Sequence, residues 1–154
     1  MSMEIHCLSD RQLDSIIDWQ QAIDAEGFAL KLSSASPFQS LKGFLPAQSG
    51  ETETGFECYH DDPAELLVEY DYIDFGHPWT FALSLRWGGD LSACLAAYMA
   101  AAAYAKATDG VVFDPEEGQI LTPQRAAECA RQIERELPTV LAELDRIRAR
   151  SDDK

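Results

Sequence analysis

The sequence predicts an α+β fold, in which helices pack on a mostly antiparallel sheet of four to six strands. Apolar and polar side chains alternate over residues 79–87, which is typical of a strand with one buried face. Residues 91–108 are expected to form a helix, and nine of these eighteen residues are alanine. After Thr122 apolar residues recur at spacings of three and four, which predicts a long C-terminal helix. At 154 residues, a single domain spanning 1–154 is expected.

The N-terminal part predicts a strand followed by a helix. Residues 3–8 are expected to form the strand, with Met3, Ile5 and Cys7 on one side. A capping box formed by Ser9 and Gln12 predicts the start of the first helix, which stops at Gly27.

Short strands are expected in the middle of the chain. Residues 28–32 alternate as a strand, and 33–37 form a turn. Residues 43–46 resemble an edge strand, because proline cannot donate to a central ladder. The polar stretch 48–54 predicts an exposed hairpin or loop, and 55–59 alternates again, with its apolar side chains on one face.

The elements around the alanine-rich helix have clear boundary signals. Residues 66–72 form either a strand or, over 63–68, a helical turn. Residues 88–90 end the central strand and cap the helix. Gly110 is expected to stop the helix in the left-handed conformation, and 111–118 returns as a short apolar run and an acidic turn.

The C-terminal helix is expected to begin at Thr122 as N-cap, with Pro123 in its first turn. Its apolar stripe continues in phase through Pro138, which predicts one kinked helix or two nearly collinear ones. Residues 151–154 are expected to fray. The stripe consists of Ala126, Ala130, Ile133, Leu137, Val140, Leu144 and Ile147.

The net charge of −15 is unevenly distributed along the chain. Residues 125–154 carry seven basic and seven acidic side chains, so the whole imbalance lies in residues 1–124. It is densest over residues 51–74, which contain nine acidic side chains and no Lys or Arg. Such a field repels nucleic acid and anionic membranes and attracts basic proteins. Solubility alone is the competing explanation for the total charge.

We expect neither a membrane span nor an export signal. The longest uncharged stretch, between Asp90 and Lys106, is fifteen residues, short of the roughly 18 that a bilayer requires. The first ten residues lack the basic start and apolar run of a signal peptide. The cysteines form no CxxC pair, so free thiols in a reducing cytoplasm are expected. They are Cys7, Cys58, Cys94 and Cys129.

The sequence contains no recognisable catalytic set. The alternative is a metal-dependent enzyme that uses His60, Asp61 and Asp62 together with Asp114. An HDDP segment is also an ordinary turn, and no helical pair of ligands accompanies it. We therefore predict that the protein is not an enzyme, with no catalytic residue, metal ligand or cofactor.

Four short motifs occur in order along the chain. They are GFLP at 43–46, GFE at 55–57, RWGG at 86–89 before the alanine-rich helix, and GVVFDPEEG at 110–118. Together they resemble small cytoplasmic immunity proteins encoded beside bacterial polymorphic toxins, in particular the immunity protein 52 group, over about residues 13 to 125. The resemblance implies an antidote that binds a nuclease-type toxin delivered by contact-dependent or type VI secretion. It identifies no toxin-contact residue.

The predicted partner is therefore a basic toxin domain, and not nucleic acid or a membrane. A nuclease presents a basic groove to phosphate, which clustered carboxylates can occupy. The predicted partner-binding residues are Glu51, Glu53, Glu57, Tyr59, Asp61, Asp62, Glu65, Asp114, Glu116 and Glu117. A further alternative is an adaptor subunit that docks through Ala97, Ala101 and Tyr104 of the alanine-rich helix.

Overall fold

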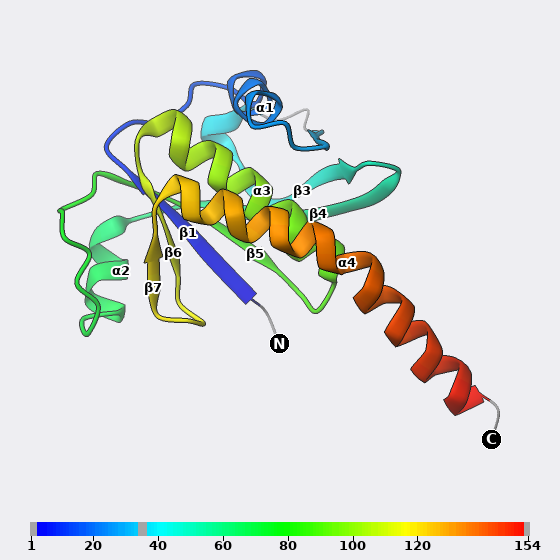
Figure 1. Cartoon of the computed structure of the whole chain (residues 1–154). Helices are drawn as coiled ribbons and strands as arrows, with labels where there is room; N and C mark the ends of the chain where they lie inside the picture. The colour runs from blue at the N-terminus through cyan, green and yellow to red at the C-terminus, as the bar shows by residue number, and fades with distance from the viewer. Residues whose placement is uncertain (1–2, 34–36, 153–154) are drawn as a thin grey trace.

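Within the described residues, seven antiparallel strands form one twisted sheet in the order β2-β3-β4-β5-β1-β6-β7 (Figure 1). The computed structural model describes residues 3–33 and 37–152. The strands are β1 (Met3–Ser9), β2 (Leu30–Leu32), β3 (Lys42–Ser49), β4 (Thr52–Asp61), β5 (Phe81–Trp87), β6 (Val111–Asp114) and β7 (Gln119–Leu121). The α+β class and the antiparallel sheet are confirmed, whereas four to six strands is too few. The three-residue β7 is too short to show an alternating pattern.

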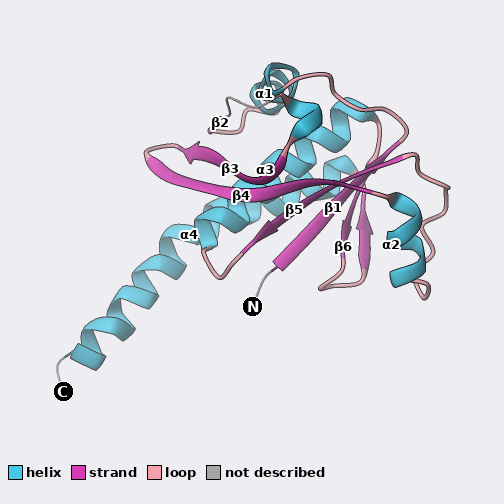
Figure 2. Ribbon diagram, turned by 180° about the vertical axis from the view of Figure 1, so that it is seen from behind, coloured by secondary structure: helices cyan, strands magenta, loops and turns pink. Residues whose placement is uncertain are grey.

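Three helices cover one face of the sheet and a fourth lies on the other (Figure 2). Besides the short 3-10 helix η1 (Phe38–Ser40), the helices are α1 (Ile16–Ala25), α2 (Pro63–Glu69), α3 (Leu91–Thr108) and α4 (Pro123–Asp152). The larger core lies between the sheet and α1, α3 and α4. In the smaller core, Leu66 of α2 packs with Leu8 and Ala82 on the opposite face. None of the helices in the described ranges has the length and apolarity needed to cross a bilayer.

The alanine-rich helix α3 is buried on nearly all sides. From Leu95 to Ala105, every residue except Tyr98 is buried. Small side chains let the sheet, α1 and α4 all approach its backbone closely. The indole ring of Trp19 reaches the backbone of α3, where its Nε1 donates a 2.9 Å hydrogen bond to the Ala100 carbonyl oxygen. Trp19 is fully buried and is therefore a core residue.

The predicted start of the first helix is wrong. Ser9 is still part of β1, which pairs with β5 through this residue, and its hydroxyl donates to the Arg11 carbonyl oxygen. The helix begins at Ile16, where the Ser15 hydroxyl accepts a hydrogen bond from the Asp18 amide. Strand pairing therefore overrides a capping signal that was read from local sequence alone.

The helical alternative for the segment after β4 is confirmed, and the strand over residues 66–72 is not. Pro63 occupies the first turn of α2, and the Asp62 carboxylate accepts a hydrogen bond from the Ala64 amide. An aspartate cap followed by proline stabilises a helix start. Of the turn predicted over residues 33–37, residues 34–36 lie outside the described part of the chain.

The β3–β4 hairpin predicted over 48–54 is confirmed. Among the described residues β2 pairs only with residues 47–49 of β3, so residues 43–46 lie at an edge of the sheet, as predicted. Pro46 ends the β2–β3 ladder. The Ser33 amide donates to the Pro46 carbonyl oxygen, and proline has no N–H for the return bond.

Both caps of α3 were predicted, but the left-handed residue was assigned one position too late. Asp90 accepts a hydrogen bond from the Ser92 amide, as expected. At the other end, Asp109 rather than Gly110 adopts the left-handed conformation, with φ of 57°. Gly110 serves a different purpose. A side chain there would collide with the Leu8 carbonyl oxygen, so the glycine lets the chain pass close to β1.

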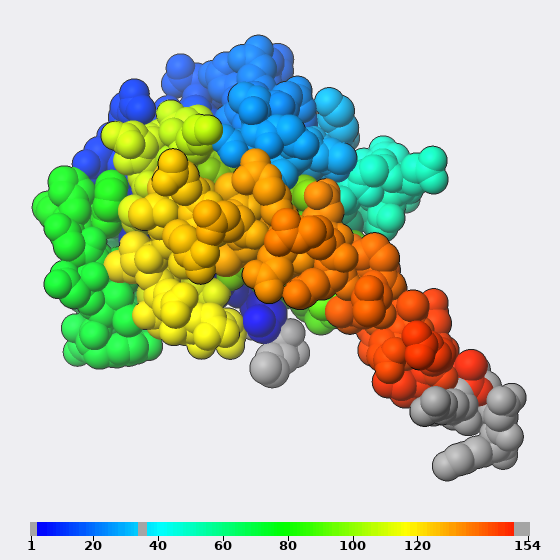
Figure 3. Space-filling model, viewed as in Figure 1, coloured from blue at the N-terminus to red at the C-terminus, as the bar shows by residue number. Residues whose placement is uncertain are grey.

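The helix α4 is continuous through Pro138, and the Thr122 hydroxyl accepts a hydrogen bond from the Arg125 amide. The C-terminal helix was expected to pack on the sheet, and it does so over part of its length. Only its first half does so, where Ala126 and Ala130 are fully buried against the core. The second half projects away from the domain, as the space-filling view shows (Figure 3). The helix extends through Asp152, and residues 153–154 of the expected frayed end lie outside the described chain.

Replacing Gly110 with alanine should lower the free energy of unfolding by about 2 kcal/mol, because β1 or the α3–β6 connection must shift to admit the methyl group. Urea unfolding followed by circular dichroism measures the change. Gly88→Ala is the matched control, because a Cβ at Gly88 has no neighbour within 4 Å among the described atoms. Equal unfolding midpoints for the two variants would contradict the close approach at Gly110.

Candidate functional site

The candidate site lies on the face of the sheet opposite α3. Residues paired across antiparallel strands point to the same side, so the strand register places side chains in rows. One row on this face contains Glu57 of β4, Arg86 of β5 and Glu4 of β1. The neighbouring row includes Ser84 and His6. Acidic, basic and imidazole groups from three strands therefore meet at the centre of the sheet.

Helix α2 and this face of the sheet form a cleft between them. Its volume is about 130 Å³, enough for about four waters or the end of one long side chain. We define the acidic cleft by its lining residues: Glu4, His6, Asp61, Asp62, Glu65, Leu66, Glu69 and Arg86. Five carboxylates therefore face one arginine and one histidine. Helix α2 supplies Glu65 and Glu69, which are four residues apart and so share one face of the helix.

Glu4 is the most heavily bonded carboxylate of the acidic cleft. Its Oε2 accepts a 3.0 Å hydrogen bond from Arg86 Nε, and its Oε1 accepts one of 3.1 Å from the Tyr70 hydroxyl. The pKa of Glu4 is lowered from 4.5 to about 2. The interaction with His6 lowers it most, and those with Tyr70 and Arg86 lower it further, whereas burial of the carboxylate raises it. Arg86 also lies 3.8 Å from Asp61 and over the Tyr59 ring. Arg86 is thus an internal counter-ion for the carboxylates of Glu4 and Asp61.

His6 is buried at the floor of the acidic cleft, with 1% of its surface exposed. Its Nδ1 is 2.6 Å from Ser84 Oγ, and its ring stacks on Phe113. The other ring nitrogen, Nε2, has no hydrogen-bond partner within the described structure, and Glu4 Oε1 lies 3.7 Å away. A buried polar atom without a partner costs free energy. His6 therefore places a buried polar atom without a partner beneath the floor of the acidic cleft.

Ser84, His6 and Glu4 have the residue types of a catalytic triad but not its accessibility. Ser84 has no exposed surface, so a substrate cannot reach its hydroxyl oxygen. This arrangement does not support nucleophilic catalysis.

The structure brings together only part of the predicted partner-binding set. Asp61, Asp62 and Glu65 line the acidic cleft. Glu57 and Tyr59 lie beside it on the same face of β4, where the Tyr59 hydroxyl donates a 2.9 Å hydrogen bond to Glu57.

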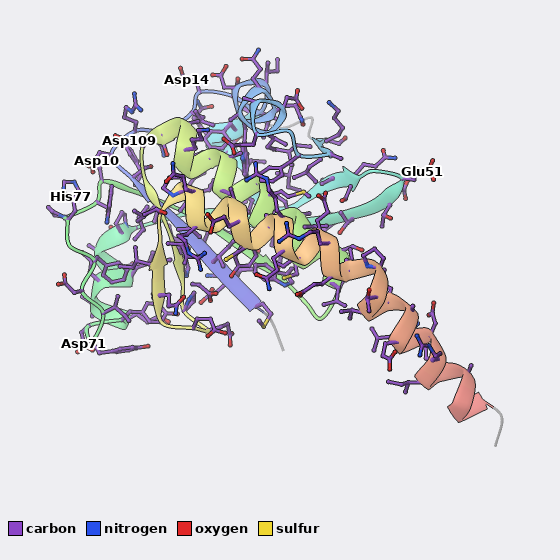
Figure 4. The ribbon with its side chains drawn as sticks, in the orientation of Figure 1. Asp10, Asp14, Glu51, Asp71, His77 and Asp109 are labelled. Carbon is purple, nitrogen blue, oxygen red and sulfur yellow. The ribbon has the colours of Figure 1, made fainter. Side chains whose placement is uncertain are left out.

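The hairpin acids lie far from the acidic cleft. Glu53 is eight residues before Asp61 on the same strand, a separation of about 26 Å. Figure 4 shows Glu51 at the hairpin tip and Asp71 at the opposite end of the molecule. Since Glu53, Glu57 and Asp61 alternate with buried residues of β4, they share one face. The acidic run therefore forms an elongated strip and not one compact patch.

The acids of the β6–β7 turn have separate roles. Asp114 is buried, accepts a 2.7 Å hydrogen bond from the Tyr98 hydroxyl, and accepts backbone N–H bonds from Glu116 and Glu117. Burial first, and then this carboxylate, raise the pKa of Tyr98. Asp114 thus shapes the turn and is not available to a partner. Glu116 instead shares a neighbouring cavity with Glu4, Tyr70 and Arg86, so it borders the acidic cleft.

Sequence reasoning missed Glu4, His6 and Glu69 as members of the site. Met3, Ile5 and Cys7 were assigned to one side of the first strand, which places Glu4 and His6 on the other. That alternation was the available signal. It became informative only once the register set these residues beside Asp61 and α2.

The metal-binding alternative is not supported by the geometry. His60 points to the helix-covered face, where its Nε2 contacts the Phe38 carbonyl oxygen at 2.9 Å, whereas Asp61 points to the opposite face. Asp62 is engaged as the cap of α2. Across the described side chains of residues 3–33 and 37–149, no group of three or more His, Cys, Asp or Glu residues is arranged to hold a metal ion.

The adaptor alternative is also not supported. Ala97, Ala101 and Tyr104 are at most 1% exposed, because α1, α4 and the sheet surround α3. They could contact another chain only if the core opened.

Comparisons with known proteins identify no relative of this chain. Models of protein families, curated proteins and solved structures all gave no match. The function is therefore argued from the site itself.

The bonded state of Glu4 predicts a specific pH dependence of stability. The pKa of Glu4 is lowered from 4.5 in the unfolded chain to about 2 in the folded protein. Its ionised form therefore stabilises the fold above pH 4.5, and that stabilisation is lost as the pH falls towards 2. Glu4→Gln removes this contribution, so the stability difference from the parent should be largest at pH 6 and should shrink towards pH 2. Urea unfolding at pH 6, 4 and 2 measures it. The exposed Glu53→Gln is the control, and a pH-independent difference for Glu4→Gln would contradict the assignment.

Proposed function

We propose that this chain is a cytoplasmic immunity protein, and not an enzyme, that neutralises a cognate bacterial toxin of nuclease type by binding it. The acidic cleft receives a lysine or arginine side chain of the toxin. The observation that carries this proposal is the imbalance within the acidic cleft. Five carboxylates share a single arginine among its lining residues.

The chemistry of the acidic cleft suits a cationic side chain. Glu65 and Glu69 from α2 and Asp61 from β4 surround a space the size of one side-chain end. A guanidinium or ammonium group there would form charge-assisted hydrogen bonds, which are stronger than neutral ones.

The acidic strip along β4 extends the proposed interface beyond the acidic cleft. Glu53 and Glu57 continue the line of negative charge for about 26 Å. A nuclease holds an extended phosphate backbone in a basic groove, so a line of carboxylates matches that groove better than a single charge. The net charge of −15 would accelerate association by electrostatic steering.

Reversing two charges in the acidic cleft should weaken toxin binding more than reversing two charges at the hairpin. The probe is the protein encoded by the adjacent upstream gene, with association measured by stopped-flow fluorescence at several salt concentrations. Glu65→Lys with Glu69→Lys should slow association and raise the dissociation rate, for a loss of affinity of at least about 100-fold, or roughly 2.7 kcal/mol.

The matched control is Glu51→Lys with Glu53→Lys, which changes the net charge equally but lies at the hairpin. It should reduce affinity by less than about tenfold, through weaker steering and the loss of the contacts that Glu53 makes at the far end of the acidic strip. Equal losses for both variants would place the interface elsewhere. If the neighbouring gene product formed no complex with the parent protein and co-expression did not restore growth, the proposed function would be wrong.

A further inference from the structure

The second half of α4 carries an apolar stripe that the described part of its own chain does not cover. Val140, Leu141, Leu144 and Ile147 are 39 to 54% exposed, and they make up four of the nine exposed large hydrophobic side chains found within the described residues. Figure 3 shows this part of the helix projecting from the domain. An isolated helix of about four turns is only marginally stable in water, so this stripe favours a packing partner.

The stripe follows a coiled-coil repeat. From Ala126 to Ile147 the apolar positions alternate strictly between spacings of four and three, which is the 3.5-residue period of a left-handed coiled coil. At Ala126 and Ala130 this seam is buried against the core that contains α3. Ile133 and Leu137 are partly buried and still pack against this core. From Val140 onward the same seam leaves the domain, so it lacks the second helix that the repeat requires.

We infer that a second copy of this chain supplies that helix, with the two α4 segments antiparallel about a two-fold axis. Such a pairing places Leu137 against Ile147 of the second copy and Val140 against Leu144 of the second copy. Leu141 then lies next to its own counterpart at the axis. Each exposed apolar residue of the stripe finds an apolar partner, so the surface is self-complementary, as a two-fold interface must be. These residues are Val140, Leu141, Leu144 and Ile147.

The charges beside the seam match the antiparallel direction. Glu134 lies beside the start of the exposed stripe and Arg148 beside its end, on the same flank. In the antiparallel pair each Glu134 faces Arg148 of the second copy, which gives two ion pairs by symmetry. Glu143 is already paired with Arg146 of its own helix at 3.4 Å.

The position of the domain excludes the parallel direction. In a parallel pair the helix of the second copy would continue along the seam from Leu137 towards Ala126. That part of the seam is already buried by the chain's own core. An antiparallel helix instead places the second domain beyond the free end of α4, where there is space (Figure 1).

Sedimentation equilibrium of the full-length protein tests the inference without any other partner, so its result is independent of the proposed toxin. Because the contact between two eleven-residue segments is small, a dissociation constant on the order of 10 µM is expected. Leu144→Glu places a charge in the seam and should raise that constant at least about tenfold. Ala142→Glu adds the same charge on the outer face of α4 and should leave it unchanged.

Two further variants test the direction of pairing. Glu134→Arg should weaken association, and adding Arg148→Glu should restore it, because the two positions exchange charges across the interface. Leu141→Cys should form a disulfide-linked dimer on oxidation, whereas Ala142→Cys should not. Any one of three results would overturn the inference. The protein could stay monomeric at 200 µM, Leu144→Glu and Ala142→Glu could have equal effects, or the double charge exchange could fail to restore association.

Discussion

The close packing around α3 is the constraint on which the rest of the structure depends. Alanine at half of its positions lets the sheet, α1 and α4 all contact one helix, and Trp19 reaches its backbone. The same arrangement fixes the ends of the flanking helices. Glu26, at the end of α1, contacts Lys106 of α3 at 2.6 Å and Arg131 of α4 at 3.5 Å. A larger residue at one of these alanine positions would push apart several elements at once.

The position of the acidic cleft follows from this packing. Because α1, α3 and α4 all lie on one face, the opposite face keeps polar residues at positions that a two-sided core would fill with apolar ones. The short helix α2 covers only part of that face, where Leu66 packs with Phe113. The remaining positions hold the carboxylates, Arg86 and His6, so the acidic cleft lies at the border between the smaller core and solvent.

The elements with strong local signals could be predicted from the sequence, and the site only in part. The alanine-rich helix, both of its capping positions, the β3–β4 hairpin and the N-cap at Thr122 were all recognisable, because each depends on residues close together in the chain. Asp61, Asp62 and Glu65 were predicted as binding residues from charge density alone. Glu4 and His6 were not, because β1 meets β4 and α2 only through the sheet register.

Composition and periodicity therefore established an α+β chain with an acidic body and a long amphipathic C-terminal helix. Only the folded structure showed that Ser9 belongs to a strand, that His60 and Asp61 point to opposite faces, and that α4 leaves the domain halfway along its stripe. The physical reason is the same in each case. Local sequence specifies which conformation a segment prefers, whereas pairing and burial between segments distant in the chain decide where it ends and what each side chain contacts.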